Sequence, residues 1–139
     1  MSAPAHDGGC LCGAVRYRAT GAPVRVTNCH CATCRRAAGA PFVTWVEFPA
    51  EAVAFTAGAP AWHGSSEAAE RGFCAACGTA LTFAYLDGET MDLTVATMDT
   101  PEDFPPEDNI WTESRLPWVA LDPAIPAWPR GRGDGDGGA

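Results

Sequence analysis

The chain has 139 residues, of which 47% are hydrophobic and 19% charged, proportions typical of one ordinary globular domain. Its formal net charge is −8, it has no lysine and its nine arginines are scattered, which argues against a surface that binds nucleic acid. No run of 18 apolar residues predicts a membrane span and the N-terminus lacks the layout of a signal peptide, so we expect a cytoplasmic protein with reduced thiols.

Short runs with the composition of β-strands, separated by Gly and Pro, dominate the sequence from the N-terminus onward and predict a mainly β, single-domain fold. The predicted strands are Val15–Thr20, Val24–Cys29, Phe42–Phe48, Val53–Thr56, Glu70–Cys74, Ala80–Tyr85 and Met91–Thr97. Within Phe42–Phe48 the even-numbered side chains would face one side of a sheet and the odd-numbered ones the other.

Little helix is expected. The segment Ala32–Ala38 predicts one short helix that ends at Gly39, and a further helical turn is predicted at Pro101–Phe104 with Thr100 as its N-cap. The segment Asn109–Pro123 has no clear periodicity but is apolar enough to pack on the domain, which we expect to occupy residues 1–130. Residues 131–139 form a Gly/Asp-rich segment that predicts a disordered tail.

The seven cysteines fall into three groups, and the first and third groups together supply four thiols. Cys10 and Cys12 stand in "GGCLCGAV", and Cys74 and Cys77 stand in "RGFCAACGTAL". A C-x-x-C followed by Gly78 is typical of a zinc knuckle, in which the glycine can take a positive φ. We therefore expect these four thiolates to form one closed structural metal site, although an iron site, a disulfide framework or simple burial of the thiols are alternatives.

The remaining group, Cys29, Cys31 and Cys34 in "NCHCATC", contains three thiols. Structural zinc sites have four protein ligands, whereas catalytic sites keep three and leave one position for water or substrate. Three local thiols therefore favour an open zinc site. The alternatives are a redox-active thiol cluster or a closed site completed by a histidine, either His30, which should point away from a metal shared by its neighbours, or the distant His63.

Four segments resemble the glutathione-dependent formaldehyde-activating enzyme family, which also contains centromere protein V. They are "GGCLCGAVRY", "NCHCATCRRAAGAPFVTW", "RGFCAACGTALTF" and "IWTESRLPWV", which occur in the family's order over roughly residues 8–129. The resemblance implies a β-tent fold with two zinc ions per chain. It assigns Cys10, Cys12, Cys74 and Cys77 to a structural site and Cys29, Cys31 and Cys34 to a catalytic one.

The resemblance also implies a reaction, the formation or cleavage of S-(hydroxymethyl)glutathione from glutathione and formaldehyde, which would make the protein a carbon–sulfur lyase with a small thiol as substrate. A zinc ion held by three thiolates suits a soft fourth ligand such as a substrate sulfur, and a thiolate is the nucleophile that would attack the aldehyde carbon. A metal-bound substrate oxygen is the alternative. His30 and His63 are candidate proton carriers.

Other side chains near these motifs are candidates for substrate contact. Arg35 and Arg36 could bind a carboxylate, or could simply be solvated residues of the helix. Aromatic residues of the predicted strand and of the C-terminal segment, together with one arginine, could line or cover a cleft or belong to the core: Phe42, Trp45, Phe48, Trp111, Arg115 and Trp118. The alternative function is a non-catalytic binding module scaffolded by zinc.

Overall fold

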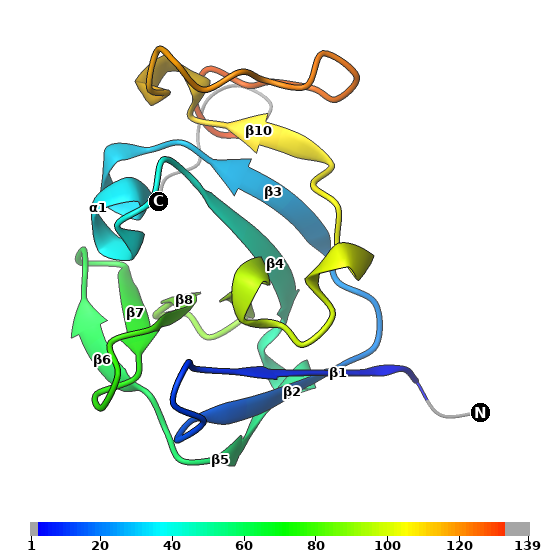
Figure 1. Cartoon of the computed structure of the whole chain (residues 1–139), viewed down its shortest axis with the longest axis vertical. Helices are drawn as coiled ribbons and strands as arrows, with labels where there is room; N and C mark the ends of the chain where they lie inside the picture. Colours follow the sequence, from blue (N-terminus) through cyan, green and yellow to red (C-terminus); the bar gives the residue numbers. More distant parts are fainter. Residues whose placement is uncertain (1–2, 133–139) are drawn as a thin grey trace.

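Two β-sheets and one short α-helix make up the computed structural model, which describes residues 3–132 (Figure 1). The smaller sheet has the strand order β1 (Ala5–Gly9), β2 (Arg16–Thr20), β5 (Val53–Ala57). The larger sheet has the order β10 (Asp108–Ile110), β3 (Arg25–Cys29), β4 (Val43–Pro49), β9 (Thr90–Thr94), β8 (Ala80–Tyr85), β7 (Ala69–Phe73), β6 (Ala61–Gly64). The prediction of a mainly β fold with little helix is confirmed; the β-tent name stays a prediction.

The strand β4 separates two hydrophobic clusters. Val46 and Phe48 belong to the main core, where the larger sheet meets Tyr17 and Ala19 of β2. Val43 and Trp45 belong to a second cluster with Cys29, Cys31 and Cys34. The alternation of side chains in β4 is the one that the sequence predicts, and it means that one face of the larger sheet is used for the core and the other for the three cysteines.

All seven predicted strands form, with ends within one or two residues of the prediction except for one. The predicted strand Met91–Thr97 is wrong at its C-terminal end, because β9 ends at Thr94 and Val95–Thr97 is a 3₁₀ turn. The Thr97 hydroxyl donates to the Thr94 carbonyl (2.8 Å), a local side-chain bond that competes with strand pairing.

Three strands were not predicted from the sequence: β1, β6 and β10. Each is short and lies at the edge of its sheet, and none has the alternation of a half-buried strand. In β10, residues 108–110 pair in parallel with Thr27–Cys29, far away in the sequence. A predicted irregular segment therefore contributes a strand through tertiary pairing alone.

The helix α1 (Ala32–Ala38) has the predicted bounds, and Gly39 ends it in the left-handed conformation at φ 64°. Its N-cap is Cys31, whose Sγ accepts a hydrogen bond from the backbone N–H of Cys34 (3.2 Å). The 3₁₀ turn Pro101–Asp103 forms as predicted, but the Thr100 side chain makes no capping hydrogen bond. Two further 3₁₀ turns are Ala50–Ala52 and Thr112–Ser114.

The C-terminal segment lies beside β10 at one end of the molecule (Figure 1). Gly131 is buried and Arg132 forms an ion pair with Asp108, so the first two residues of the predicted tail are packed on the domain; residues 133–139 lie outside the described part. The division into a domain of residues 1–130 and a tail stays a prediction. No helix of the described part is long and apolar enough to cross a membrane.

Candidate metal centres and active site

The four cysteines of the first and third motifs converge at one edge of the molecule, where the β1–β2 loop meets the β7–β8 turn. Their sulfur atoms all lie within 4.8 Å of one another. The Cys10–Cys12 and Cys12–Cys74 sulfurs are 3.7 and 3.8 Å apart. A tetrahedral zinc with Zn–S bonds of about 2.3 Å places its sulfurs about 3.8 Å apart, so the thiols fit such an ion closely.

Both turns have the backbone geometry of a metal knuckle. Gly13 and Gly78 follow the cysteine pairs with φ of 79° and 82°, the positive φ expected for Gly78. The backbone N–H groups of Val15 and Cys77 donate to the sulfurs of Cys10 (3.3 Å) and Cys74 (3.4 Å). N–H donors of this kind stabilise thiolates, which are the form that a metal binds.

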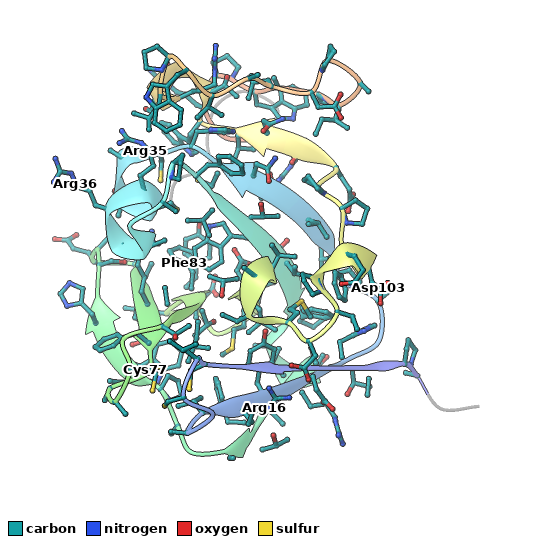
Figure 2. All side chains as sticks on the ribbon, in the orientation of Figure 1. Arg16, Arg35, Arg36, Cys77, Phe83 and Asp103 are labelled. Atoms are coloured by element: carbon teal, nitrogen blue, oxygen red, sulfur yellow. The ribbon has the colours of Figure 1, made fainter. Side chains whose placement is uncertain are left out.

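Thr79 also links the two turns. Its hydroxyl accepts a hydrogen bond from the Leu11 N–H (3.1 Å) and lies 3.2 Å from the Cys77 sulfur. Hydrogen bonding to Thr79 lowers the pKa of the Cys77 thiol to about 5. Figure 2 shows Cys77 beside the loop that joins β1 and β2, at the opposite end of the molecule from β10.

The three cysteines of the second motif lie at the junction of β3 and α1. Cys29 ends β3, Cys31 caps α1 and Cys34 lies in its first turn. All three are buried and their sulfurs lie within 4.8 Å of one another. The strand end and the first helical turn together bring three sulfurs to one point, close enough to share a metal ion.

A cavity of about 120 Å³ opens beside this trio. Two of the three cysteines, Cys29 and Cys34, line it. The aromatic residues Trp45, Phe83 and Trp111 form an apolar wall of the cavity. The charged residues that line the cavity are Arg25, Glu47, Asp92 and Arg132. None of the four other cysteines lines this cavity, although Cys10 lines a separate hollow of about 740 Å³. A tetrahedral ion held by four thiolates has no free position, whereas an ion held by three has one, so the trio is the group that could take a further ligand.

Arg71, on β7, is a cation in contact with the trio. Its guanidinium donates from both Nη atoms to the Cys34 sulfur (3.7 and 3.6 Å), and the side chain is only 7% exposed. It lies over Phe83, with Cζ 4.9 Å from the ring centroid. A buried arginine in contact with a sulfur favours the thiolate, since the two charges offset each other in a medium of low dielectric.

The thiols of the trio do not ionise independently. Hydrogen bonding with Cys29 lowers the pKa of Cys31 to about 3, whereas the same contact raises the pKa of Cys29 far above its usual range. The Cys31 thiolate therefore accepts a hydrogen bond from a neighbouring thiol, which keeps its own proton. A divalent cation would replace the thiol protons, which is the behaviour of a metal-binding thiol cluster.

Asp92 lies in the middle of the larger sheet, on β9. In the strand register it stands opposite Glu47 of β4 and Phe83 of β8. Its Oδ1 is buried without a hydrogen-bond partner among the described residues. Burial, with a smaller contribution from the negative charge of Glu47, raises the pKa of Asp92 to about 8.

Trp111 follows β10 and has φ 58°, the left-handed region, where no other described residue except glycine is found. Such a conformation strains a bulky residue. Three backbone hydrogen bonds hold it, from Trp111, Thr112 and Glu113 to the carbonyls of residues 128–130. Its indole Nε1 is buried and has no partner within residues 3–132.

The other predicted site residues are placed differently. His30 points away from the trio, as expected: its Nε2 lies 2.9 Å from the Asn109 Oδ1 and its ring packs on Phe42. Burial lowers the pKa of His30. His63 is exposed on β6 and is not among the residues whose ligand atoms meet the three sulfurs.

Most of the remaining candidates lie outside the cavity. Arg36 extends from α1 into solvent, and neither it nor Arg35 lines the cavity (Figure 2). Phe48 belongs to the main core, Arg115 donates to the Val119 carbonyl (2.7 Å), and Trp118 is 71% exposed. Of the aromatic candidates, Trp45 and Trp111 line the cavity and Phe42 packs on His30.

Arg71 and Asp92 are site residues that were not predicted from the sequence. Each carries a faint signal, a charged residue inside a run that otherwise reads as a buried strand, "AERGF" and "TMDLT". A charge in such a position is rarely buried unless it has a partner or a task. Which charge lies next to which cysteine depends on the pairing of five strands, and the sequence does not show that pairing.

Comparisons with known proteins give one relative in sequence and one similar structure. An uncharacterized lyase of Schizosaccharomyces pombe is 36% identical over 88 residues, 62% of this chain and 62% of that protein. A Rhodobacter sphaeroides protein of known crystal structure has a similar fold, with a TM-score of 0.54 over 87% of this chain and 98% of that one, at 18% identity.

The family comparison covers most of the chain. The model of the glutathione-dependent formaldehyde-activating enzyme matches residues 5–114, a range that includes all seven cysteines, Arg71, Asp92 and Trp111. The matched range begins with β1 and ends in the 3₁₀ turn after β10, so it spans both sheets and both cysteine groups. On this evidence, the chain belongs to the glutathione-dependent formaldehyde-activating enzyme family.

Proposed function

We propose that the protein is a carbon–sulfur lyase that forms or cleaves the adduct of a small thiol with an aldehyde, with S-(hydroxymethyl)glutathione as the first candidate. One observation carries the proposal: three buried cysteines meet at a point, and two of them line a cavity. A group of three ligands with adjoining space is the arrangement of a site that takes substrate as its fourth ligand.

We propose two zinc ions per chain. Cys10, Cys12, Cys74 and Cys77 would hold a structural ion that ties the two loops together. Cys29, Cys31 and Cys34 would hold a catalytic ion, whose chemistry when bound is to take up a substrate sulfur and favour its thiolate. All seven thiols are free, as metal binding requires and as a reducing compartment such as the cytoplasm would maintain.

The protein's own residues would prepare the site. Arg71 offsets part of the negative charge of the three thiolates, because its two donors contact Cys34. Trp45 and Phe83 exclude water from the sulfurs on the cavity side. A dry wall and a fixed cation favour the attack of a thiolate on the aldehyde carbon, since a desolvated thiolate is the better nucleophile.

The test is the rate of adduct exchange. Zinc-loaded protein should accelerate the interconversion of formaldehyde and glutathione with S-(hydroxymethyl)glutathione, measured by exchange NMR, and other small thiols should be compared in the same experiment. Metal analysis should give two zinc ions per chain. The absence of acceleration with every thiol, in protein that holds both ions, would mean that the chain is instead a non-catalytic binding module.

A further inference from the structure

Three residues that line the cavity beside the three cysteines have a buried side-chain atom without a hydrogen-bond partner among the described residues. One of these atoms, the Arg25 Nε, lies 3.0 Å from the Glu47 carboxylate in an ion pair, which leaves two without any partner in that part of the chain. They are the carboxylate Oδ1 of Asp92 and the indole Nε1 of Trp111, and both residues line the cavity together with Cys29 and Cys34. Buried polar atoms in native proteins nearly always have a partner, and an exception needs an explanation. A ligand that bears a donor–acceptor group would satisfy both atoms.

The neighbouring charges in the cavity are already paired, so Asp92 differs from them. Arg25 and Glu47 form an ion pair at 3.0 Å, and Arg132 is paired with Asp108. The charged and titratable side chains that line the cavity with Asp92, from β3, β4, α1, β8 and the C-terminal segment, are Arg25, Glu47, Cys29, Cys34, Tyr85 and Arg132. Asp92 is the carboxylate of this group with a buried oxygen left over for a ligand.

Trp111 gives a second, independent indication. Its strained left-handed backbone is held by three hydrogen bonds to residues 128–130, and this conformation accompanies an indole that lines the cavity. Strain of this kind persists where the surrounding structure fixes it, and it concentrates at functional sites. An indole N–H is a donor only, so its missing partner must be an acceptor.

We propose that Asp92 and Trp111 form the oxygen-binding end of the active site. The Trp111 N–H donates a hydrogen bond to the hydroxyl oxygen of the thiol–aldehyde adduct, and the Asp92 carboxyl exchanges a proton with the same oxygen. This inference rests on the proposed lyase function, since a proton transfer to oxygen has meaning only if the adduct is made or cleaved here.

The step balances without an oxidant or a further reactant. In cleavage, the Asp92 carboxylate takes the hydroxyl proton, the C=O bond forms, and the C–S bond breaks with its electron pair left on sulfur. In formation, the thiolate electron pair makes the C–S bond, the C=O π pair moves to oxygen, and oxygen takes the proton of the Asp92 carboxyl. Solvent then restores the starting protonation of Asp92, and the thiol proton leaves to solvent when the thiolate forms.

The size and polarity of the cavity agree with this role. A volume of about 120 Å³ is well below the roughly 300 Å³ or more of pockets that enclose whole ligands. It suits the hydroxymethyl end of an adduct and leaves a tripeptide thiol such as glutathione to extend outside. Because Asp92 carries a raised pKa, its carboxyl keeps its proton near neutral pH and can act as the acid in adduct formation.

The first test is kinetic. Asp92→Asn keeps the shape of the side chain but removes the exchangeable proton, and it should lower kcat for adduct exchange by about 10²–10⁴-fold with the KM for the thiol and two zinc ions per chain retained. In wild type, kcat should change with pH as the Asp92 carboxyl titrates, and the variant should lose this change. Trp111→Phe should lower kcat by about tenfold or more, since it removes one hydrogen-bond donor to a developing oxyanion. Asp99→Asn, a matched carboxylate that is paired with Arg16 and does not line the cavity, should lower kcat by less than tenfold.

The second test measures binding and does not need turnover. The probes are 2-mercaptoethanol and 1-propanethiol, which have nearly the same shape but differ in one hydroxyl group, and calorimetry gives their affinities for zinc-loaded protein. Wild type should prefer 2-mercaptoethanol by about tenfold, and both Asp92→Asn and Trp111→Phe should reduce this preference several-fold. Asp99→Asn should keep it.

The two tests separate the failures. A wild-type protein that holds two zinc ions but accelerates no exchange contradicts the proposed function, and the proton-transfer role of Asp92 with it. An active wild type with an equally active Asp92→Asn variant overturns the proton-transfer role alone. A wild type without preference between the two probes, or variants that keep the preference, overturns the assignment of Asp92 and Trp111 as the oxygen-binding end.

Discussion

The two cysteine groups contain the same ligand atom but have opposite surroundings. The four-cysteine group joins two loops, and one of its members, Cys12, is exposed. The backbone N–H groups of the loops themselves donate to its sulfurs. The trio is wholly buried on one face of the larger sheet, contacts the Arg71 guanidinium and adjoins a cavity. The number of thiols and the surroundings therefore point to the same division, with one group for stability and one for chemistry.

We propose that position, more than ligand type, separates the two roles. The four-thiol group lies at loop ends and brings together chain segments more than 60 residues apart, which is the arrangement of a stabilising site. A three-thiol group beneath aromatic side chains has its remaining side open to a cavity. If this division is wrong, substitutions in the two groups will have the same effects.

Replacement of Cys74 should have the largest effect. Cys74→Ser removes a buried ligand that holds the β7–β8 turn against the β1–β2 loop, and structural metal binding is coupled to folding. We expect the free energy of unfolding to fall by about 5 kcal/mol or more, close to the whole stability of a small domain. Thermal unfolding monitored by circular dichroism checks it, with metal content measured in parallel. A folded variant with unchanged stability would contradict the structural role.

Replacement of Cys31 should affect function far more than stability. Cys31→Ser keeps a helix-capping oxygen for the Cys34 N–H while it removes one sulfur of the trio. We expect zinc to fall from two ions to one per chain and adduct exchange to fall by about 10³-fold or more, with a loss of stability of about 1–2 kcal/mol. The measurements are metal analysis, exchange NMR and thermal unfolding. If Cys31→Ser and Cys74→Ser behave alike, the division of the sites is wrong.

Arg71 should tune the trio without being one of its ligands. Arg71→Gln removes the charge that contacts the Cys34 sulfur, and the loss of such a supporting group typically lowers metal affinity about 10–100-fold. Competition with a chelator that reports free zinc measures the affinity of the trio for its ion. The ion held by Cys10, Cys12, Cys74 and Cys77 should be retained, since the hydrogen bonds of Arg71 to sulfur within residues 3–132 go to Cys34. Equal losses at both sites would argue against a local effect.

Ionisation of Asp92 should lower the free energy of unfolding as pH rises. Its folded pKa is raised to about 8, above the unfolded value of about 3.9, so the unfolded state binds fewer protons between these values and stability falls across this window. Asp92→Asn removes this cost, and we expect it to be more stable than wild type by about 1–3 kcal/mol near pH 8, with the difference vanishing below pH 4. Urea unfolding at several pH values measures it. A variant less stable than wild type at pH 8 would contradict the buried, protonated carboxyl.

Trp118 should matter least. It is 71% exposed and does not line the cavity, although it belongs to a motif of the family resemblance. Trp118→Ala should change the free energy of unfolding by no more than about 0.5 kcal/mol and leave the exchange rate within twofold. A large loss of rate without loss of stability would show that the C-terminal segment covers the site in solution.

The sequence by itself determined the parts of this protein that depend on local spacing. The grouping of the seven cysteines into two pairs and a trio follows from C-x-C and C-x-x-C spacing, because such spacings bring neighbouring sulfurs together whatever the rest of the fold does. The meeting of the two pairs, more than 60 residues apart, depends on the fold. The helix ends at Gly39 and the second knuckle turns at Gly78 because a positive φ there needs glycine. The alternation of Phe42–Phe48 placed Val46 in the core and Trp45 beside the cysteines, since strand side chains alternate by geometry.

Only the tertiary structure decided what surrounds the three thiols. Asp92 of β9 and Trp111 after β10 line the cavity beside the trio, and Arg71 of β7 contacts the Cys34 sulfur. The order and register of the strands in the larger sheet bring all three there. Register depends on the packing of whole sheets, so the sequence does not encode it at any single position. The left-handed conformation of a tryptophan has no sequence signature either, because its hydrogen bonds come from residues 128–130. The sulfur ligands were therefore readable from the sequence, whereas the groups that would handle the substrate oxygen were not.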